Sequence, residues 1–231
     1  EAPMRRGRPS ANTRWDNSVA ILTGDFLFSR ASDILADLGP EAVRIQARTF
    51  ERLVTGQIRE TVGPADGQDE VEHHLQVLAD KTGSLIATSA QFGAMFAGCD
   101  ETIIDTVTRY GERIGVAFQL ADDLVDLTSD SAHSGKTPGT DLKEGVPTLA
   151  GLLVLQQGGD ERLLEMLARP LSDDEVVVAL DLLRAHPALQ EARAVARQWA
   201  DDARACLEPL PAGSARDGLA SVCDYVVNRT G

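Results

Sequence analysis

Apolar residues recur at helical spacing along almost the whole chain, and this periodicity restricts the possible folds more than any other feature of the sequence. After Asp16-Asn17, which are favourable N-cap residues, they lie three or four positions apart until Gly39-Pro40 ends the pattern, and a second segment of this kind reaches Gly63-Pro64. No segment alternates apolar and polar residues as a half-buried strand does, and no repeat of fixed period is present. The sequence therefore predicts an all-α fold.

Two long helices are expected in the middle of the chain, from about Glu70 to Gly98 and from Asp100 to about Thr128. The following segment, Ser129 to Gly145, is rich in Gly, Ser, Thr and Asp, which predicts a loop; loops of this length inside a compact domain are commonly functional or disordered. Five shorter helices divided by Pro, Gly and Ser are predicted beyond it: Pro147 to Gln157, Glu161 to Ala168, Ser172 to Ala185, Pro187 to Leu207 and Ser214 to Val227.

The size and composition fit one globular domain over residues 1–231, with 43% apolar and 25% charged residues. The 22 basic and 36 acidic side chains give a net charge of -14, which would repel a nucleic-acid backbone, so no nucleic-acid partner is expected. The three cysteines are widely spaced and form no CxxC pair, which indicates neither a disulfide framework nor a zinc site and favours a cytoplasmic location. No apolar run approaches the roughly 20 residues that span a bilayer.

The segment from Gln119 to Asp126 places three carboxylates in the middle of an apolar helix. Residues four apart share a helix face, so Asp122 and Asp126 point the same way and Asp123 lies beside them. Carboxylates this close repel each other unless a cation neutralises them, and oxygen ligands that leave room for water and phosphate oxygens suit Mg²⁺. The alternative is a solvated acidic helix face, which is common in so acidic a chain. Another acid pair, Asp173-Asp174, lacks a further acid four residues on.

Two basic segments suit phosphate binding. Lys136 lies in a Gly-rich loop that follows the carboxylate helix, where it can hold phosphate oxygens that share the metal. Arg5 and Arg6 belong to a basic cluster that is out of character in an acidic chain, and guanidinium groups match phosphate bidentately. An exposed solubilising end is an equally good explanation of the arginines, and a surface loop is a common explanation of the lysine.

A face of small residues follows Lys81 in the long helix that starts near Glu70. Gly83, Ala87, Ala90 and Ala94 fall at helical spacing and carry almost no side-chain bulk. Close helix packing is the usual reason for such a face, although glycine costs a helix about 1 kcal/mol relative to alanine. The alternative is the wall of an elongated apolar cavity with Lys81 at its polar mouth.

These four segments, in their order along the chain, resemble those of the trans-isoprenyl diphosphate synthases (polyprenyl synthetases), of the bacterial medium- and long-chain type. The similarity extends over essentially the whole chain. The resemblance implies a helical bundle of the isoprenoid synthase type with a deep central cavity. It also implies a prenyltransferase that condenses isopentenyl diphosphate with an allylic diphosphate to give a longer trans-polyprenyl diphosphate. The reaction would proceed by Mg²⁺-assisted ionisation, carbon-carbon bond formation and proton elimination.

The resemblance also assigns roles to individual residues. Asp122, Asp123 and Asp126 would bind the Mg²⁺ ions that hold the allylic diphosphate, and Lys81 and Lys136 would stabilise the departing pyrophosphate. Thr82 and Gln119 would lie beside the allylic C1, where their dipoles favour developing positive charge. The remaining expected substrate contacts are Arg5, Arg6, Gln57, Glu60 and Arg229.

The chain departs from the family pattern in two places. The first aspartate-rich motif of the family, with the helices that precede it, would stand before the segment that Glu1 opens, so we expect the intact protein to be longer by on the order of 100 residues. Val146 stands where many relatives carry a lysine, and Lys143 is a turn of sequence away.

Two other functions remain open on the sequence. A non-catalytic subunit of a heteromeric prenyl diphosphate synthase would share the fold but usually lacks the aspartates and lysines found here. A class I terpene cyclase is expected to lack the basic Arg5-Arg6 segment and the Lys136 loop. The resemblance further implies a homodimer formed through about Ala42 to Gly98, and transient membrane contact for product release. It does not indicate the product chain length.

Overall fold

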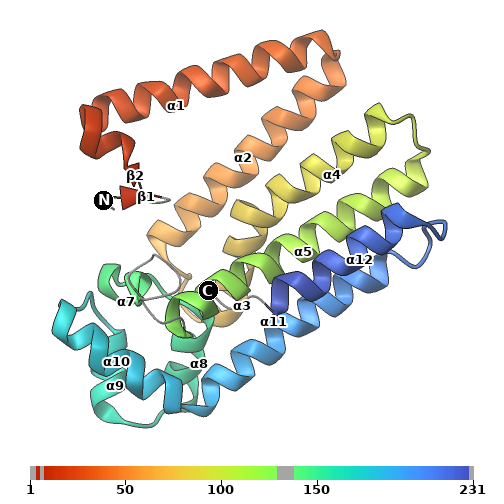
Figure 1. Cartoon of the computed structure of the whole chain (residues 1–231). Helices are drawn as coiled ribbons and strands as arrows, with labels where there is room; N and C mark the ends of the chain where they lie inside the picture. The colour runs from red at the N-terminus through yellow and green to blue at the C-terminus, as the bar shows by residue number, and fades with distance from the viewer. Residues whose placement is uncertain (1–3, 6–7, 129–137, 229–231) are drawn as a thin grey trace. The chain divides into compact units, whose positions relative to one another are not determined.

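The computed structural model describes residues 4–5, 8–128 and 138–228, which belong to two compact units, Glu1–Phe50 and Glu51–Gly231. Helices form nearly all the regular structure of both units, which confirms the predicted all-α fold (Figure 1). The exception is an antiparallel pair of two-residue strands, β1 (Met4–Arg5) and β2 (Arg8–Pro9), which the sequence did not predict.

The first unit contains β1, β2, α1 (Ala11–Asp37) and the first part of α2 (Pro40–Val62). α1 begins earlier than predicted, because Ser10 caps it by accepting a hydrogen bond from the backbone N–H of Thr13. Asp16 interrupts the helix with a φ of 72°, and its carboxylate accepts from the backbone N–H of Val19 at 3.1 Å. Asp16 therefore caps the longer part of α1, as its residue type predicted.

The second unit holds the end of α2 and all the later helices. In chain order these are α3 (Glu70–Leu78), the π-helical turn η1 (Ala79–Gly83), α4 (Ser84–Phe96), α5 (Glu101–Thr128), α7 (Thr140–Glu144), α8 (Leu149–Gln157), α9 (Glu161–Leu167), α10 (Asp173–Ala185), α11 (Pro187–Cys206) and α12 (Ser214–Val227). The bounds of α5 and of the last five helices agree with the prediction to within two residues. None of the described helices combines the length and the apolar character that a membrane crossing requires.

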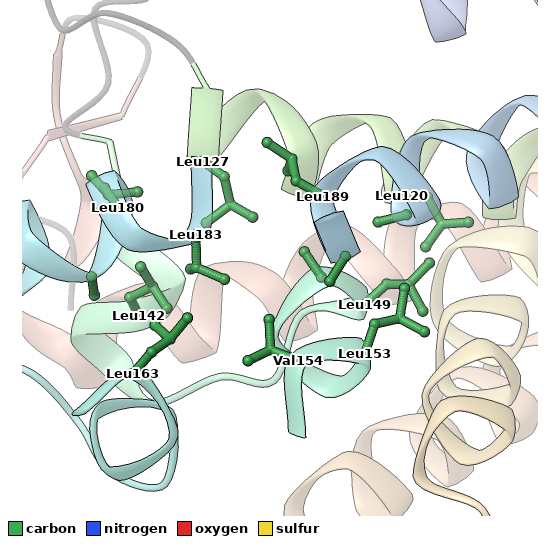
Figure 2. Close-up of a cluster of buried hydrophobic side chains, with 14 of the residues drawn as sticks. Leu120, Leu127, Leu142, Leu149, Leu153, Val154, Leu163, Leu180, Leu183 and Leu189 are labelled. Atoms are coloured by element: carbon green, nitrogen blue, oxygen red, sulfur yellow. The ribbon is translucent and has the colours of Figure 1, made fainter. Parts of the chain in front are cut away.

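The core of the second unit is built on α5, which runs between α4 and α11 (Figure 1). The last turns of α5 supply Leu120 and Leu127 to a buried layer that also receives side chains from α8, α9, α10 and α11 (Figure 2). A second cluster joins the middle of α5 to α11 and α12 through small side chains such as Ala117 and Ala203. Both layers fix α5 along its length, so the polar residues on its remaining faces are held by a rigid support.

Glycines bring α5 unusually close to η1 and α4. A Cβ placed on Gly111 would lie 2.7 Å from the Cα of Ala87, and one on Gly115 would lie 2.7 Å from the Cα of Gly83. Ala87 is buried, with 4% of its surface exposed. For Gly83 and Ala87, the small-residue face is therefore explained by close helix packing, and the alternative of a cavity wall is wrong at these two positions.

The structure differs from the prediction at two segments near the polar end of α5. The expected continuous helix from Glu70 to Gly98 contains the π-helical turn η1, where the backbone N–H of Ser84 bonds to the carbonyl of Ala79. The expected loop contains α7, which lies between the left-handed residues Gly139 (φ 77°) and Gly145 (φ 70°). In both places tertiary packing, which periodicity does not report, decides the backbone geometry.

Candidate active site

The carboxyl end of α5 gathers carboxylates. Asp122, Asp123 and Asp126 lie on its last turns, between the buried residues Ala121 and Leu127. The end of a helix already carries partial negative charge from its free carbonyl groups. Added carboxylates make this a place where a cation is strongly favoured.

Asp123 carries a perturbed carboxyl. Burial and, to a smaller extent, the charges of Asp141, Asp122 and Asp126 together raise the pKa of its carboxyl to about 7. A hydrogen bond from Nε2 of Gln119 to Oδ1 of Asp123, 3.0 Å long, opposes this shift. The surroundings of Asp123 therefore disfavour a negative charge on its carboxyl.

Asp141 is a member of the group that the sequence analysis missed. Its backbone N–H donates to Oδ2 of Asp126 at 3.4 Å, and the N–H of Gly139 donates to the carbonyl of Asp126 at 3.1 Å. These bonds join the start of α7 to the end of α5. The signal in the sequence was the acid that directly follows the glycine and threonine of the loop, Gly139-Thr140-Asp141.

The donor set suits a hard divalent cation. Asp122, Asp123, Asp126 and Asp141 offer only oxygen atoms, and the shifted pKa of Asp123 shows that their charges interact. Within the described ranges, no three His, Cys, Asp or Glu side chains are already arranged as a metal-binding group. By its chemistry, this all-oxygen donor set is compatible with a divalent cation that also takes oxygen ligands from outside the protein.

A chain of hydrogen bonds links η1 to this acidic end. The hydroxyl of Thr82 donates to Oε1 of Gln119 at 3.1 Å, and the amide of Gln119 in turn donates to Asp123. Thr82, Gln119 and Asp123, which were predicted to share a site, are thus brought together across two elements. Close packing of Gly115 against Gly83 holds the backbones at the distance that this chain of bonds needs.

Lys81 lies on the side of η1 that faces α2. Its Nζ is 2.6 Å from Oε2 of Glu60, and the same oxygen accepts from Nε2 of Gln57 at 2.8 Å. The Lys81 and Glu60 side chains are 31% and 28% exposed, so both remain accessible to a ligand. An ammonium group has three donors, and this one retains capacity for phosphate oxygens. The structure thus joins Gln57, Glu60 and Lys81, whose proximity the sequence did not show.

A cavity of about 220 Å³ lies beside this group, between the end of α2, α3 and the segment before α8. Glu60, His74 and Val146 are among its lining residues. Burial lowers the pKa of His74 to about 4, with the charge of His73 adding to the shift and that of Glu60 opposing it. Val146 presents an apolar side chain to the cavity, where the resemblance leads us to expect a lysine. The nearby Lys143 is paired with Asp173 at 2.5 Å.

Four of the predicted site residues cannot be placed. Arg6, Lys136 and Arg229 lie outside the described residues, and only the backbone of Arg5, in β1, is described. Their assignments stay predictions.

Comparison with known proteins agrees with this chemistry. The family model described as polyprenyl synthetase matches residues 1–183. A nonaprenyl diphosphate synthase of Mycobacterium tuberculosis is 49% identical over 234 residues, which cover 100% of this chain and 70% of that protein. A dimethylallyltranstransferase of the same organism is 43% identical and is matched over 99% of this chain and 70% of its own length.

Solved structures show the same similarity. A geranylgeranyl pyrophosphate synthase of Corynebacterium glutamicum, complexed with calcium and isoprenyl diphosphate, is 42% identical with a TM-score of 0.83, over 96% of this chain and 70% of that one. A polyprenyl synthase of Caulobacter crescentus, also with calcium and isoprenyl diphosphate, has a TM-score of 0.90 at 29% identity, over 100% and 72% of the two chains.

Proposed function

Because this chain belongs to the polyprenyl synthetase family, we propose that it is a prenyltransferase that lengthens an allylic diphosphate with isopentenyl diphosphate. The observation that carries the proposal is the chain of hydrogen bonds from Thr82 through Gln119 to Asp123. Lys81, the residue before Thr82, adds a cation that pairs with Glu60 on α2. The relatives named above are synthases and transferases of prenyl diphosphates. A class I terpene cyclase and a non-catalytic subunit are not favoured by these similarities.

We propose that Asp122, Asp123 and Asp126 would hold Mg²⁺, with Asp141 supporting the group, and that the bound ion would supply positive charge for the diphosphate of the allylic substrate. Calcium with isoprenyl diphosphate in two related structures supports the use of a divalent cation. The neighbouring carboxylates, which together with burial raise the pKa of Asp123, support the same placement.

The chain's own side chains then have separate tasks. Lys81 stabilises the pyrophosphate that leaves with the electron pair of the broken C–O bond, while the dipoles of Thr82 and Gln119 stabilise positive charge at the allylic carbon. That carbon bonds to the isopentenyl double bond, and loss of a proton restores a double bond in the product. By resemblance, Arg5, Arg6, Lys136, Gln57, Glu60 and Arg229 complete the binding of the two substrates.

The test is direct. Purified protein is incubated with isopentenyl diphosphate and an allylic diphosphate, with and without Mg²⁺, and the chain length of the product is followed by chromatography. We expect a longer prenyl diphosphate that forms only with the metal. Protein that binds both substrates without coupling them would instead support the non-catalytic subunit, and a cyclic hydrocarbon would support the cyclase.

We also propose a homodimer and a cytoplasmic location. The apolar residues Leu85 and Phe96, 46% and 51% exposed, share one face of α4 with Ser89 and Phe92, and this face is a candidate for the contact between subunits. The described cysteines are free, which suits a reducing compartment. Release of an apolar product would require transient contact with a membrane.

A further inference from the structure

A buried carboxylate stands directly before Lys81. Asp80 is only 3% exposed, and both of its oxygens are occupied: Oδ1 accepts from Nε of Arg52 at 2.8 Å and from Nε2 of Gln76 at 3.1 Å, and Oδ2 accepts from Nη1 of Arg59 at 2.6 Å. A buried charge is costly unless it is paired and hydrogen-bonded, and removing one partner of such a group is strongly destabilising. None of the residues in the proposed chemistry requires this carboxylate for its own charge balance, so its placement needs another reason.

The carboxylate joins two elements at the point where they come closest. Arg52 and Arg59 lie on α2, on either side of Gly56, and a Cβ on Gly56 would lie 2.8 Å from the Cβ of Asp80 and 3.1 Å from Cγ of Lys81. The backbone of α2 is therefore packed against the first side-chain carbons of Asp80 and Lys81. A shift of η1 relative to α2 would move Lys81 and break the bonds to Asp80 together.

Three consecutive residues of η1 make contacts in three different places. Asp80 binds the arginines of α2, Lys81 pairs with Glu60 at the end of α2, and Thr82 bonds to Gln119 on α5. The turn that carries them is π-helical, and the hydroxyl of Ser84 donates to the carbonyl of Asp80 at 2.6 Å. A π-helical turn is locally less favourable than an α-helical one and is found frequently at functional sites. Fixed contacts on both sides are what this geometry needs in order to persist.

We propose that Asp80 is a positioning residue for the reaction: through Arg59 and Arg52 it fixes η1 against α2, so that Lys81 stays within reach of the leaving pyrophosphate. This inference rests on the proposed function and adds a residue to it. Asp80 is not a substrate contact, because both of its oxygens are bound to protein groups and it is buried. Its effect on turnover therefore has to pass through Lys81.

The test compares Asp80→Asn, which keeps the shape of the side chain and removes its charge, with Lys81→Ala and with the double variant. The rates are measured in single turnovers with radiolabelled isopentenyl diphosphate, a method that follows very slow reactions. Misplacement of a catalytic group by about 1 Å can cost on the order of 100-fold. We expect Asp80→Asn to lower the rate by about tenfold or more in the wild-type background, with the KM for isopentenyl diphosphate unchanged, and to have no further effect in the Lys81→Ala background.

Glu112→Gln is the matched control. Glu112 pairs with the same Arg52, and the change is again isosteric, but Glu112 makes no bond to Arg59. We expect this variant to retain the wild-type rate. Melting temperatures are measured for all variants, and the assays are run well below the lowest of them.

Arg59→Gln removes the other partner of the ion pair between Arg59 and Asp80. The Arg59 side chain is 47% exposed, so this variant is the one to use if Asp80→Asn fails to fold. It should lower the rate in the wild-type background and leave it unchanged in the Lys81→Ala background. The inference is overturned if either substitution lowers the rate of the Lys81→Ala protein by the same factor as it lowers the wild-type rate. It is also overturned if the Asp80→Asn protein turns over at the wild-type rate. If the wild-type protein forms no elongated product, both the proposed function and the inference fail. If the wild-type protein is active and Asp80→Asn does not change its rate, the inference alone fails.

Discussion

The hydroxyl of Thr82 donates a hydrogen bond to Oε1 of Gln119, 3.1 Å away and 37 residues later in the chain. This bond joins η1 to α5 and fixes the orientation of the Gln119 amide, whose nitrogen is then free to donate to Asp123. Breaking it should therefore affect two of the proposed catalytic groups at once.

Thr82→Val should lower kcat by about tenfold or more, because it removes the hydroxyl while keeping the branched shape; removal of one preorganised polar group at a reacting centre typically costs ~10²–10³-fold. Thr82→Ser keeps the hydroxyl and should retain most of the activity. Steady-state assays with both substrates decide this. An active Thr82→Val together with an impaired Thr82→Ser would show that the methyl group, and not the hydrogen bond, is what matters.

Asp122→Ala and Asp123→Ala should each reduce turnover by about 100-fold or more, because each removes an oxygen ligand from the proposed Mg²⁺ group. Asp201→Ala, at an exposed position on α11, is the control for loss of one negative charge in this acidic chain. Activity is titrated with Mg²⁺ after treatment with a chelator. A wild-type rate that survives complete removal of the metal would refute the assignment.

Gly111→Ala should destabilise the fold by about 1–3 kcal/mol, because the added Cβ would lie 2.7 Å from the backbone of Ala87 and overpacking costs about this much. Gly218→Ala, in the helix α12 with no atom within 4 Å of its Cβ, should instead stabilise by up to about 1 kcal/mol. Urea unfolding measures both. A neutral Gly111→Ala would mean that α4 and α5 can separate at little cost.

Glu175→Gln should reduce stability at neutral pH and have less effect in acid. The hydrogen bond from Arg169 and, to a smaller extent, the bonds from Ser172 together lower the pKa of Glu175 to about 2. Because the folded-state pKa lies below the unfolded value near 4.5, the stabilisation is complete above about pH 4.5 and is lost as the pH falls toward 2.

Urea midpoints of wild type and Glu175→Gln should therefore differ at pH 7 and converge as the pH is lowered from 4.5. Glu208→Gln, at an exposed position, should leave the midpoint unchanged throughout. A difference that stays constant down to pH 3 would contradict a role for the ionised carboxylate.

Leu85→Glu should convert the proposed dimer into a monomer, because it places a charge on the apolar face of α4. Val177→Glu, 61% exposed on α10, makes the same chemical change elsewhere and should leave the mass unchanged. Light scattering at micromolar concentration gives the mass of each. A wild-type protein that is already monomeric would refute the dimer.

Much of the fold was predictable because it depends on local order in the sequence. Apolar spacing and cap residues located α5 and the last five helices to within two residues. The pattern of carboxylates in one helix likewise predicted where Asp122, Asp123 and Asp126 would gather, since residues four apart share a face whatever surrounds the helix.

The sequence by itself therefore determined the fold class, the order of the helices and the acidic end of α5. Only the tertiary structure decided which distant groups meet: Lys81 with Glu60, Thr82 with Gln119, Asp141 with Asp126, and Asp80 with two arginines of α2. It also decided that η1 is π-helical and that Gly83 and Ala87 pack against α5. The physical reason is that helical spacing reports which side chains share a face, whereas the partner of that face depends on how closely two backbones approach, and a pair of glycines far apart in the chain sets that distance here.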